Sequence, residues 1–319
     1  MINQKKLIVS HAPFWHDGSR IVPRSYNMMI AALPAIFAGI YLYGFPALGV
    51  VALSISSAIF WELLMNKVMK RSVTIGDGNA ALIGLVFAML IPATFPWWAV
   101  LTGTFVAIVI GKQIFGGIGG NAFNPVAVSI AILMISWKDL FDFNETLASY
   151  TFNFEAAYPL ASMKHFGIAS IDHLTLIDLL IGKQTGGIGA TCGLALIIGG
   201  FYLILRGFIR WEIVFSFLAG IFITALIFNL NNPNLYAGPA FHLLTGYTLA
   251  GAFFLAPEDS SSPVNFIPML IYGAVCGLMT VLIRNIGAYV DGVIYAVLIA
   301  NLMSPLLDKI RPKAMGKVV

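Results

Sequence analysis

Ten apolar segments recur along the chain, and each is about as long as a helix that crosses a lipid bilayer. A membrane-spanning helix needs about 20 predominantly apolar residues. Clear turn signals separate the segments, such as NNPN (231–234) and EDSSSP (258–263). The segments are residues 26–43, 47–66, 80–95, 97–115, 122–137, 189–205, 212–229, 241–256, 265–283 and 288–307.

The composition excludes a fold that is surrounded by water. Only 10% of the 319 residues are charged, whereas a soluble globular protein carries about 25%. The hydrophobic fraction is 59% and the mean hydropathy is +0.88, which is more apolar surface than a water-soluble fold can bury. A soluble enzyme, a disordered chain and a disulfide-rich secreted scaffold are excluded. We predict an all-α integral membrane protein with about ten transmembrane helices.

The distribution of basic residues indicates how the chain crosses the membrane. If the N-terminus is cytoplasmic, 14 of the 18 Lys and Arg residues fall in inner segments. The outer segments then hold only Lys138, Lys164, Lys183 and Arg284. The positive-inside rule favours this orientation. We therefore predict that both termini are cytoplasmic, and we attribute the net charge of +4 to topology and not to nucleic-acid binding.

The predicted spans divide into five plus five around a long outer loop, and an odd number per half implies that the halves are inverted relative to each other. Segments 81–92 (ALIGLVFAMLIP) and 243–257 (LLTGYTLAGAFFLAP) are faintly similar, as such a repeat requires. Within the outer loop, residues 171–181 have helical spacing. The predicted order is a cytoplasmic N-terminal segment (1–25), a first membrane half (26–137), the outer loop (138–188), a second membrane half (189–307) and a basic cytoplasmic tail (308–319).

The first candidate site is the glycine-rich stretch TGGIGATCG, residues 185–193, which leads from the outer loop into an apolar run. Thr191 is expected within one turn of a helix N-terminus, where free N–H groups attract anions and phosphate above all. Its hydroxyl can hydrogen-bond a phosphate or be esterified by one. Without Cβ atoms, Gly186, Gly187 and Gly189 let the backbone approach a bulky ligand. The alternative is a helix cap with glycines for close packing.

The second candidate is GKQIFGGIGGNAFNPV, residues 111–126, on the predicted cytoplasmic side. Its glycines give a flexible backbone, and the amides of Asn121 and Asn124 can orient a bound cofactor or a partner subunit at the membrane boundary. A tight turn between helices is the alternative. In DGNAAL, residues 77–82, Asp77 either binds a cation or caps the helix that follows.

Ionisable side chains within the predicted spans are few, and two of them are candidates for a function. Glu62 lies in the inner third of the second span, and His242 begins the eighth. An intramembrane carboxylate is a functional candidate by default, although Glu62 is close enough to Lys67 to be an interfacial anchor. Cys192 is interpreted as a small packing residue, and two cysteines are too few to ligate a cluster within this chain. The sequence contains neither a catalytic triad nor a Walker loop.

Several motifs, taken together and in order, resemble a known family: the D subunit of the Rnf ferredoxin:NAD oxidoreductase complex and the B subunit of the sodium-pumping NADH:quinone oxidoreductase. The likeness runs from about Arg24 to Asp308. Its motifs are DGNAAL, LIPATFPWW (90–98), IFGGIGGNAFNPVAV (114–128), GGIGATCGLALIIGG (186–200), FHLLTGYTLAGAFFLAPEDSSSPV (241–264) and GAYVDGVIYAVLIANLMSPLLDK (287–309). The stretch APEDSSSPV departs from the usual ATDPVTSPV.

The resemblance implies a covalent flavin. In that family, a threonine at the start of span six carries FMN through a phosphoester bond, which an exported flavin transferase forms with FAD and magnesium. The family pattern reads approximately G-x-x-G-E-T-S/T, so Thr191 matches the acceptor. Ala190 replaces the usual glutamate and Cys192 the usual serine or threonine. The implied FMN site therefore comprises Thr191, Gly186, Gly187, Gly189 and Ala190.

The resemblance also implies a subunit of an ion-translocating redox complex in the cell membrane. Its partners would be lipids, an outer-face flavoprotein, a membrane-embedded iron–sulfur pair and a cytoplasmic module for NADH or ferredoxin, since this chain has no such site itself. Riboflavin, known in the B-type relatives, is a further candidate cofactor. Two other classes stay open: an inverted-repeat channel or transporter without flavin, and a structural subunit that has lost its cofactor.

Overall fold

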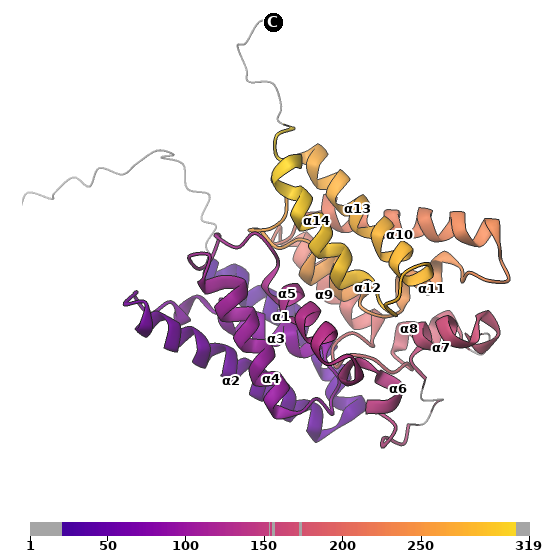
Figure 1. Ribbon diagram of the computed structural model, residues 1–319, viewed down its shortest axis with the longest axis horizontal. Helices are drawn as coiled ribbons and strands as arrows, with labels where there is room; N and C mark the ends of the chain where they lie inside the picture. The colour runs from indigo at the N-terminus through magenta and orange to yellow at the C-terminus, as the bar shows by residue number, and fades with distance from the viewer. Residues whose placement is uncertain (1–20, 153, 155–156, 172–173, 311–319) are drawn as a thin grey trace, which may run out of the picture.

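Every regular element in the described part of the chain is a helix (Figure 1). The computed structural model describes residues 21–310 apart from 153, 155, 156, 172 and 173. The predicted all-α fold is therefore confirmed. Residues 1–20 and 311–319, which make up most of the predicted cytoplasmic N-terminal segment and basic tail, lie outside the described residues.

The first five predicted spans form one group of helices (Figure 1). Proline explains two of its boundaries. α3 is shorter than expected because Ile91, which precedes Pro92, is extended with φ −102° and ψ 155°. Pro96 then precedes the first residue of α4. The elements are α1 (Ile21–Tyr43), α2 (Phe45–Val68), the 3-10 helix η1 (Ile75–Asp77), α3 (Asn79–Leu90), α4 (Trp97–Phe105), the π-helix η2 (Val106–Gln113) and α5 (Pro125–Ser136).

The last five predicted spans form a second group. The predicted span 241–256 is not one helix, because the chain turns at Gly246, whose φ is 64°. In this group α10 packs along α13, and α1 of the first group packs against α9. The elements are α9 (Gly193–Leu205), α10 (Trp211–Asn231), α11 (Pro239–Leu244), α12 (Thr248–Ala250), the π-helix η5 (Gly251–Leu255), α13 (Phe266–Asn285) and α14 (Val293–Leu307).

The long segment between the two groups has its own secondary structure, and its short helices α6, α7 and α8 gather at one end of the molecule (Figure 1). The expected helix over 171–181 starts only at Leu176, because the Thr175 hydroxyl accepts a hydrogen bond from the Asp178 N–H and so caps it. The elements are η3 (Lys138–Phe141), α6 (Phe143–Thr146), α7 (Pro159–Phe166), η4 (Ile168–Ile171) and α8 (Leu176–Ile181).

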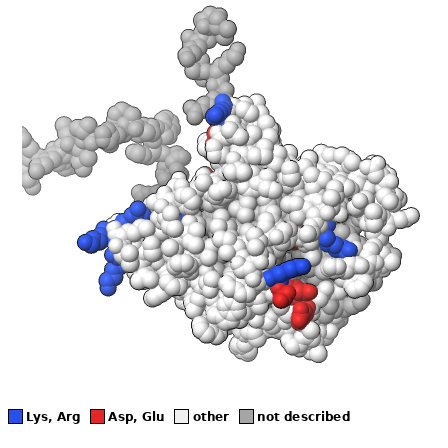
Figure 2. Space-filling view, in the orientation of Figure 1, with Lys and Arg blue, Asp and Glu red and all other residues white. Residues whose placement is uncertain are grey.

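Four of the described helices are long and apolar enough to cross a membrane: residues Val22–Tyr43 of α1, and α2, α10 and α13. α3, α4 with η2, α5, α9 and α14 are apolar but shorter. Most of the face in Figure 2 is free of charged side chains, which appear at its left edge, near its top and in a group of basic and acidic residues at its lower right. The chain is thus a multi-pass membrane protein, and the number of ten membrane crossings stays a prediction.

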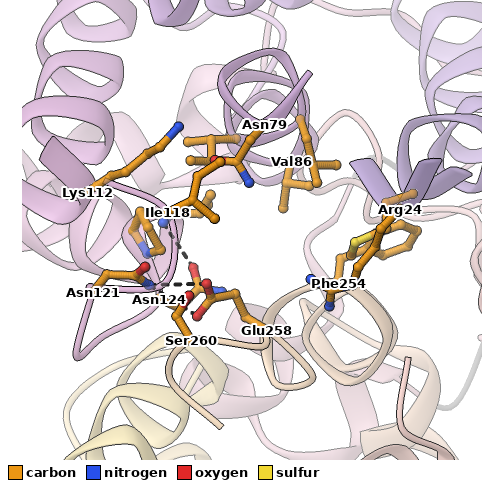
Figure 3. Close-up of a pocket in the computed structure, with 15 residues that line it drawn as sticks. Arg24, Asn79, Val86, Lys112, Ile118, Asn121, Asn124, Phe254, Glu258 and Ser260 are labelled. Atoms are coloured by element: carbon orange, nitrogen blue, oxygen red, sulfur yellow. Dashed lines mark hydrogen bonds between the residues drawn. The ribbon is translucent and has the colours of Figure 1, made fainter. Parts of the chain in front are cut away.

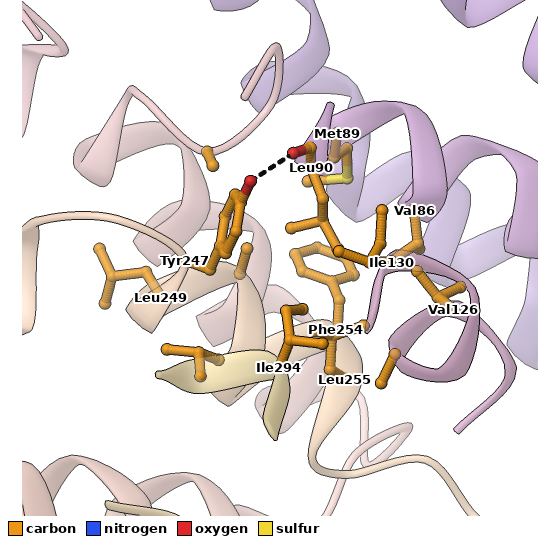
Figure 4. Close-up of a cluster of buried hydrophobic side chains, with 14 of the residues drawn as sticks. Val86, Met89, Leu90, Val126, Ile130, Tyr247, Leu249, Phe254, Leu255 and Ile294 are labelled. Atoms are coloured by element: carbon orange, nitrogen blue, oxygen red, sulfur yellow. Dashed lines mark hydrogen bonds between the residues drawn. The ribbon is translucent and has the colours of Figure 1, made fainter. Parts of the chain in front are cut away.

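A buried hydrophobic cluster joins the two groups of helices (Figure 4). Leu90 of α3 and Ile130 of α5 meet Phe254 of η5 and Ile294 of α14 there. The Tyr247 hydroxyl crosses the same junction and donates a 2.7 Å hydrogen bond to the Leu90 carbonyl. This core fixes the interrupted ends of the helices, where the candidate sites lie.

Candidate functional site

The glycine-rich turn before α9 packs against the broken end of α3. Ile188 N–H donates to the Ile91 carbonyl at 3.0 Å, and Gly189 N–H donates to the Met89 carbonyl at 2.9 Å. With the Tyr247 bond to Leu90, all three terminal carbonyls of this break have a partner. Backbone groups without partners are costly inside a membrane, so the turn stabilises the interruption of α3.

This packing explains two of the three glycines in the motif. A Cβ atom on Gly187 would lie 2.6 Å from the Met89 carbonyl oxygen, and one on Gly189 would lie 2.5 Å from Met89 Cγ. Gly187 and Gly189 therefore pack against the end of α3, and their lack of a Cβ atom is explained by that contact. A Cβ on Gly186 would lie 3.4 Å from Thr191 Cγ2, so only Gly186 borders the predicted acceptor.

Thr191 lies two residues before α9 begins, and it is 2% exposed. Cys192, not Thr191, is the residue that precedes the helix, and neither side chain caps it. Within the described residues, the Thr191 hydroxyl makes no hydrogen bond. The helix-cap alternative for Thr191 was therefore wrong, and the hydroxyl is left for another partner. Ala190 is also buried and lies beside Gly186 in a space too small for water.

Thr191 and Cys192 line a cavity of about 420 Å³, which we call the Thr191 cavity. Thr151, Phe152 and Phe154 form a second wall, and the end of α8 forms a third. Lys183 lies at its edge, half-exposed, with its ammonium 2.8 Å from Asp178 Oδ1. The remaining lining residues are Ala38, Tyr41, Leu42, Ile181 and Gly182.

Asn121 and Asn124 line a second, smaller cavity at the other end of α3 (Figure 3), which has a volume of about 60 Å³. That volume holds a few water molecules. The Asn124 side chain accepts from the N–H groups of Val126 and Ala127 and donates to the Leu255 carbonyl at 3.0 Å. The Asn121 amide donates to Glu258 at 3.1 Å. Both amides therefore tie the first group of helices to the second.

Two side chains in the first group have their roles settled by this geometry. The Asp77 carboxylate accepts a hydrogen bond from the Asn79 N–H at 2.8 Å, at the first residue of α3. This contact supports the interpretation of Asp77 as a capping residue and not as a cation ligand. Burial raises the pKa of the Asp77 carboxyl, and the hydrogen bond from Asn79 opposes that shift. Glu62 is fully buried and bonded at 2.8 Å to the ammonium of Lys112, so the interfacial-anchor interpretation was wrong.

A second buried ion pair supports the break in the eighth predicted span. The Arg284 guanidinium lies 3.0 Å from Asp291 Oδ1 and also donates to the carbonyls of His242 and Thr245. Tyr247 N–H donates to Asp291 Oδ2 at 2.7 Å. Arg284 was expected among the outer-segment charges, and its role in this ion pair was not predicted. The signal was Asp291 at the start of the last span.

His242 is fully buried, and neither of its ring nitrogens has a partner within the described residues. The structure therefore gives it no ligand or ion pair. Among the described residues, no group of three or more His, Cys, Asp and Glu side chains could hold a metal ion.

The interrupted apolar helices, joined by buried ion pairs, define a multi-pass α-helical membrane protein with polar sites at two helix breaks. Residues 8–316 match the model of the NQR2, RnfD, RnfE family, and the chain belongs to that family. It is 34% identical over 313 residues to the D subunit of the Na⁺-translocating ferredoxin:NAD⁺ oxidoreductase complex of Acetobacterium woodii, covering 97% of this chain and 94% of the relative.

Enterobacterial relatives are similar at slightly lower identity. The chain is 32% identical over 345 residues to the D subunit of the ion-translocating oxidoreductase complex of Escherichia coli strain K12. It is 31% identical over 344 residues to the protein of the same name from Shigella boydii serotype 18. In both comparisons, 97% of this chain and 98% of the relative are covered. The predicted family is confirmed.

Proposed function

We propose that this chain is a membrane subunit of a redox-driven, ion-translocating oxidoreductase complex, and that it carries FMN covalently on Thr191 and relays electrons. The family match and the names of the relatives support the first part. The second part is supported by one observation above all: Thr191 is a buried residue at the wall of the Thr191 cavity, and its hydroxyl makes no hydrogen bond within the described residues.

The residues around Thr191 fit a flavin mononucleotide. The start of α9 provides free N–H groups and a positive helix dipole near the phosphate. Lys183, which is paired with Asp178, lies at the edge of the cavity, and the aromatic residues add a flat apolar wall. Ala190 and Cys192 do not disrupt this arrangement, because both side chains are small and Cys192 donates weakly to the Leu180 carbonyl at 3.7 Å.

The chemistry of attachment follows from the hydroxyl. The Thr191 oxygen forms a new bond to the phosphorus of the FMN half of FAD, AMP leaves with the bridging oxygen, and the hydroxyl proton is released. An exported flavin transferase with magnesium would catalyse this step. Bound FMN supplies the electron transfer, and the protein sets its position and its potential. The electrons come from and pass to sister subunits, because the proposed site on this chain holds the carrier alone.

The proposed topology has ten crossings in two inverted halves, with both termini in the cytoplasm and Thr191 outside. Corresponding positions at the helix breaks support it. Gly78 and Gly246 precede α3 and α12 with φ of 71° and 64°. At the start of α5, the Asn124 side chain accepts a hydrogen bond from the N–H of the residue two positions later. Asp291 does the same at the start of α14. Interrupted helices at equivalent places are typical of inverted repeats.

Asn121 and Asn124 remain proposed contributors to cofactor or partner binding at the inner end. Their cavity holds only a few waters, so a riboflavin there would require the loop after η2 to move. We therefore assign the first flavin to the Thr191 cavity.

In-gel flavin fluorescence of the denatured polypeptide tests the proposal. The protein is produced with a competent flavin transferase, and the wild type is compared with Thr191→Ala and Thr185→Ala. Thr185 is a matched control, because it is also buried and unpartnered within the described residues but lies outside the Thr191 cavity. We expect a fluorescent band in the wild type and in T185A, and none in T191A. A dark wild-type band would favour a transporter or a structural subunit.

A further inference from the structure

We infer that the flavin ring lies on an aromatic wall of the Thr191 cavity, with Phe152 and Phe154 as its platform. This inference rests on the proposed function and adds the residues that position the ring. The two phenylalanines line the same cavity as Thr191, although they are about 40 residues away in sequence. Phosphate attachment and ring contact are therefore available within one space.

The two phenylalanines of this wall belong to a stack of three aromatic rings, of which the third, Tyr150, does not line the cavity. The Phe152 and Phe154 ring centroids are 5.1 Å apart with 23° between their planes. Tyr150 lies 5.7 Å from Phe152 on a nearly parallel plane, at 10°. Phe152 and Phe154 are partly exposed, so apolar ring surface is available to the cavity. A further flat ring extends such a stack in the offset geometry that aromatic pairs prefer.

Tyr43 connects this wall to the phosphate end. Its ring meets Tyr150 and Phe152 edge-on, with both centroid distances 5.9 Å. Its hydroxyl donates to the Gly186 carbonyl and accepts from the Gly186 N–H, both at 3.1 Å. Tyr43 is buried, so one rigid side chain sets the distance between the aromatic wall and the turn that carries Thr191. Tyr43 is thus a positioning residue.

The remaining sides of the cavity suit the rest of the flavin. Leu42 and Ala38 of α1 and Ile181 of α8 are apolar, and Lys183 is the charged residue at the edge. Tyr41 is 93% exposed and lies at the rim. A ring on the Phe152–Phe154 platform would therefore be held on one face and reachable from the rim, as electron exchange with a partner subunit requires.

The test compares native and denatured flavin fluorescence in Phe152→Leu, Phe154→Leu and the wild type. Stacking on an aromatic ring quenches flavin emission. We expect the leucine variants to keep a wild-type in-gel band, because Thr191 is intact, but to show several-fold higher emission per flavin in the folded state. Phe152→Tyr should restore the quenching. Phe166→Leu is the control, because Phe166 lies in the same long segment, is 77% exposed and does not line the cavity.

The outcomes separate this inference from the proposed function. A dark wild-type band in the denaturing gel overturns both. A fluorescent wild-type band with equal native emission in the wild type, F152L and F154L overturns the aromatic platform alone. If a leucine variant is also less thermostable, Phe152→Tyr is the deciding variant. If F152Y has normal stability but its native emission is as high as that of F152L, a stacking role is contradicted.

Discussion

Thr191 differs from most of the buried threonines in this protein. The hydroxyls of Thr104, Thr245, Thr248 and Thr280 donate to backbone carbonyls one turn earlier or nearby, which is the usual arrangement in membrane helices. Within the described residues, the hydroxyl of Thr191 has no such bond. A hydroxyl kept from its own backbone at a cavity wall is what a covalent phosphate acceptor requires.

Substitution at Thr191 should separate chemistry from folding. Thr191→Ser keeps a hydroxyl and should retain partial flavin attachment, whereas Cys192→Ala should retain it fully, because the cysteine makes only a weak bond to the Leu180 carbonyl. The loss of stability in Thr191→Ala should be small, about 1 kcal/mol, since the side chain caps no helix. In-gel fluorescence and the melting temperature in detergent measure these effects. Complete attachment in T191A would move the acceptor elsewhere.

The Glu62–Lys112 pair is a second residue-scale test. Lys112→Met leaves a buried carboxylate without its partner and should cost about 3–5 kcal/mol. The double variant Glu62→Gln with Lys112→Met carries no net charge there and should recover most of the loss. Melting temperatures in detergent provide the comparison. Lys183→Met is the control: Lys183 is half-exposed and paired with Asp178, so its replacement should change the melting temperature little. An equally unstable double variant would show that charge pairing is not the cause.

At the scale of elements, the GGIG turn and the end of α3 act as one unit. Gly187→Ala places a methyl group against the Met89 carbonyl and should cost about 1–3 kcal/mol by overpacking. Gly186→Ala is the matched control, because its Cβ makes an ordinary contact 3.4 Å from Thr191 Cγ2. The melting temperature should fall for G187A and change little for G186A. Equal behaviour of the two variants would contradict the packing role.

The sequence predicted the positions of the helices well but not how they break. Hydrophobic length located α1, α2, α10 and α13 to within a few residues. It could not show that the predicted span 189–205 begins at Gly193, because the preceding turn is held by carbonyls of α3 about 100 residues away. The predicted span 80–95 ran past Pro92, although that proline is itself a stop signal for the helix. The turn at Gly246, in contrast, depends on Arg284 and Asp291.

The candidate site was also predictable only in part. The motif around Thr191 indicated the proposed acceptor, because its glycines and threonine lie together in the sequence. The aromatic wall could not be predicted, since Phe152 and Phe154 reach Thr191 only through tertiary folding. Glu62 and Lys112 are 50 residues apart, and their ion pair likewise depends on the packing of α2 against η2.

For the whole molecule, the orientation in the membrane decides which subunits could exchange electrons with the flavin that we propose on Thr191. We expect the segment between α5 and α9 to face outward, because most basic residues lie in the other loops. Ser149→Cys, on an exposed residue of that segment, should react with an impermeant thiol reagent on spheroplasts. Ser72→Cys, exposed in the opposite loop, should react only after lysis.

This labelling requires a background without accessible native thiols. Cys276 is buried, and the partly exposed Cys192 is replaced by alanine. Labelling of Ser72→Cys in intact spheroplasts, with none at Ser149→Cys, would invert the topology and place Thr191 out of reach of an exported transferase.

Peptide mass spectrometry of the tryptic fragment 184–206 tests the covalent flavin most directly. Cleavage after Lys183 and Arg206 releases this fragment, which contains both Thr185 and Thr191. From cells with a competent flavin transferase, we expect the mass increment of one FMN less one water, with fragment ions that place it on Thr191. An unmodified fragment, or an increment on Thr185, would contradict the proposal that Thr191 carries the electron-transferring flavin.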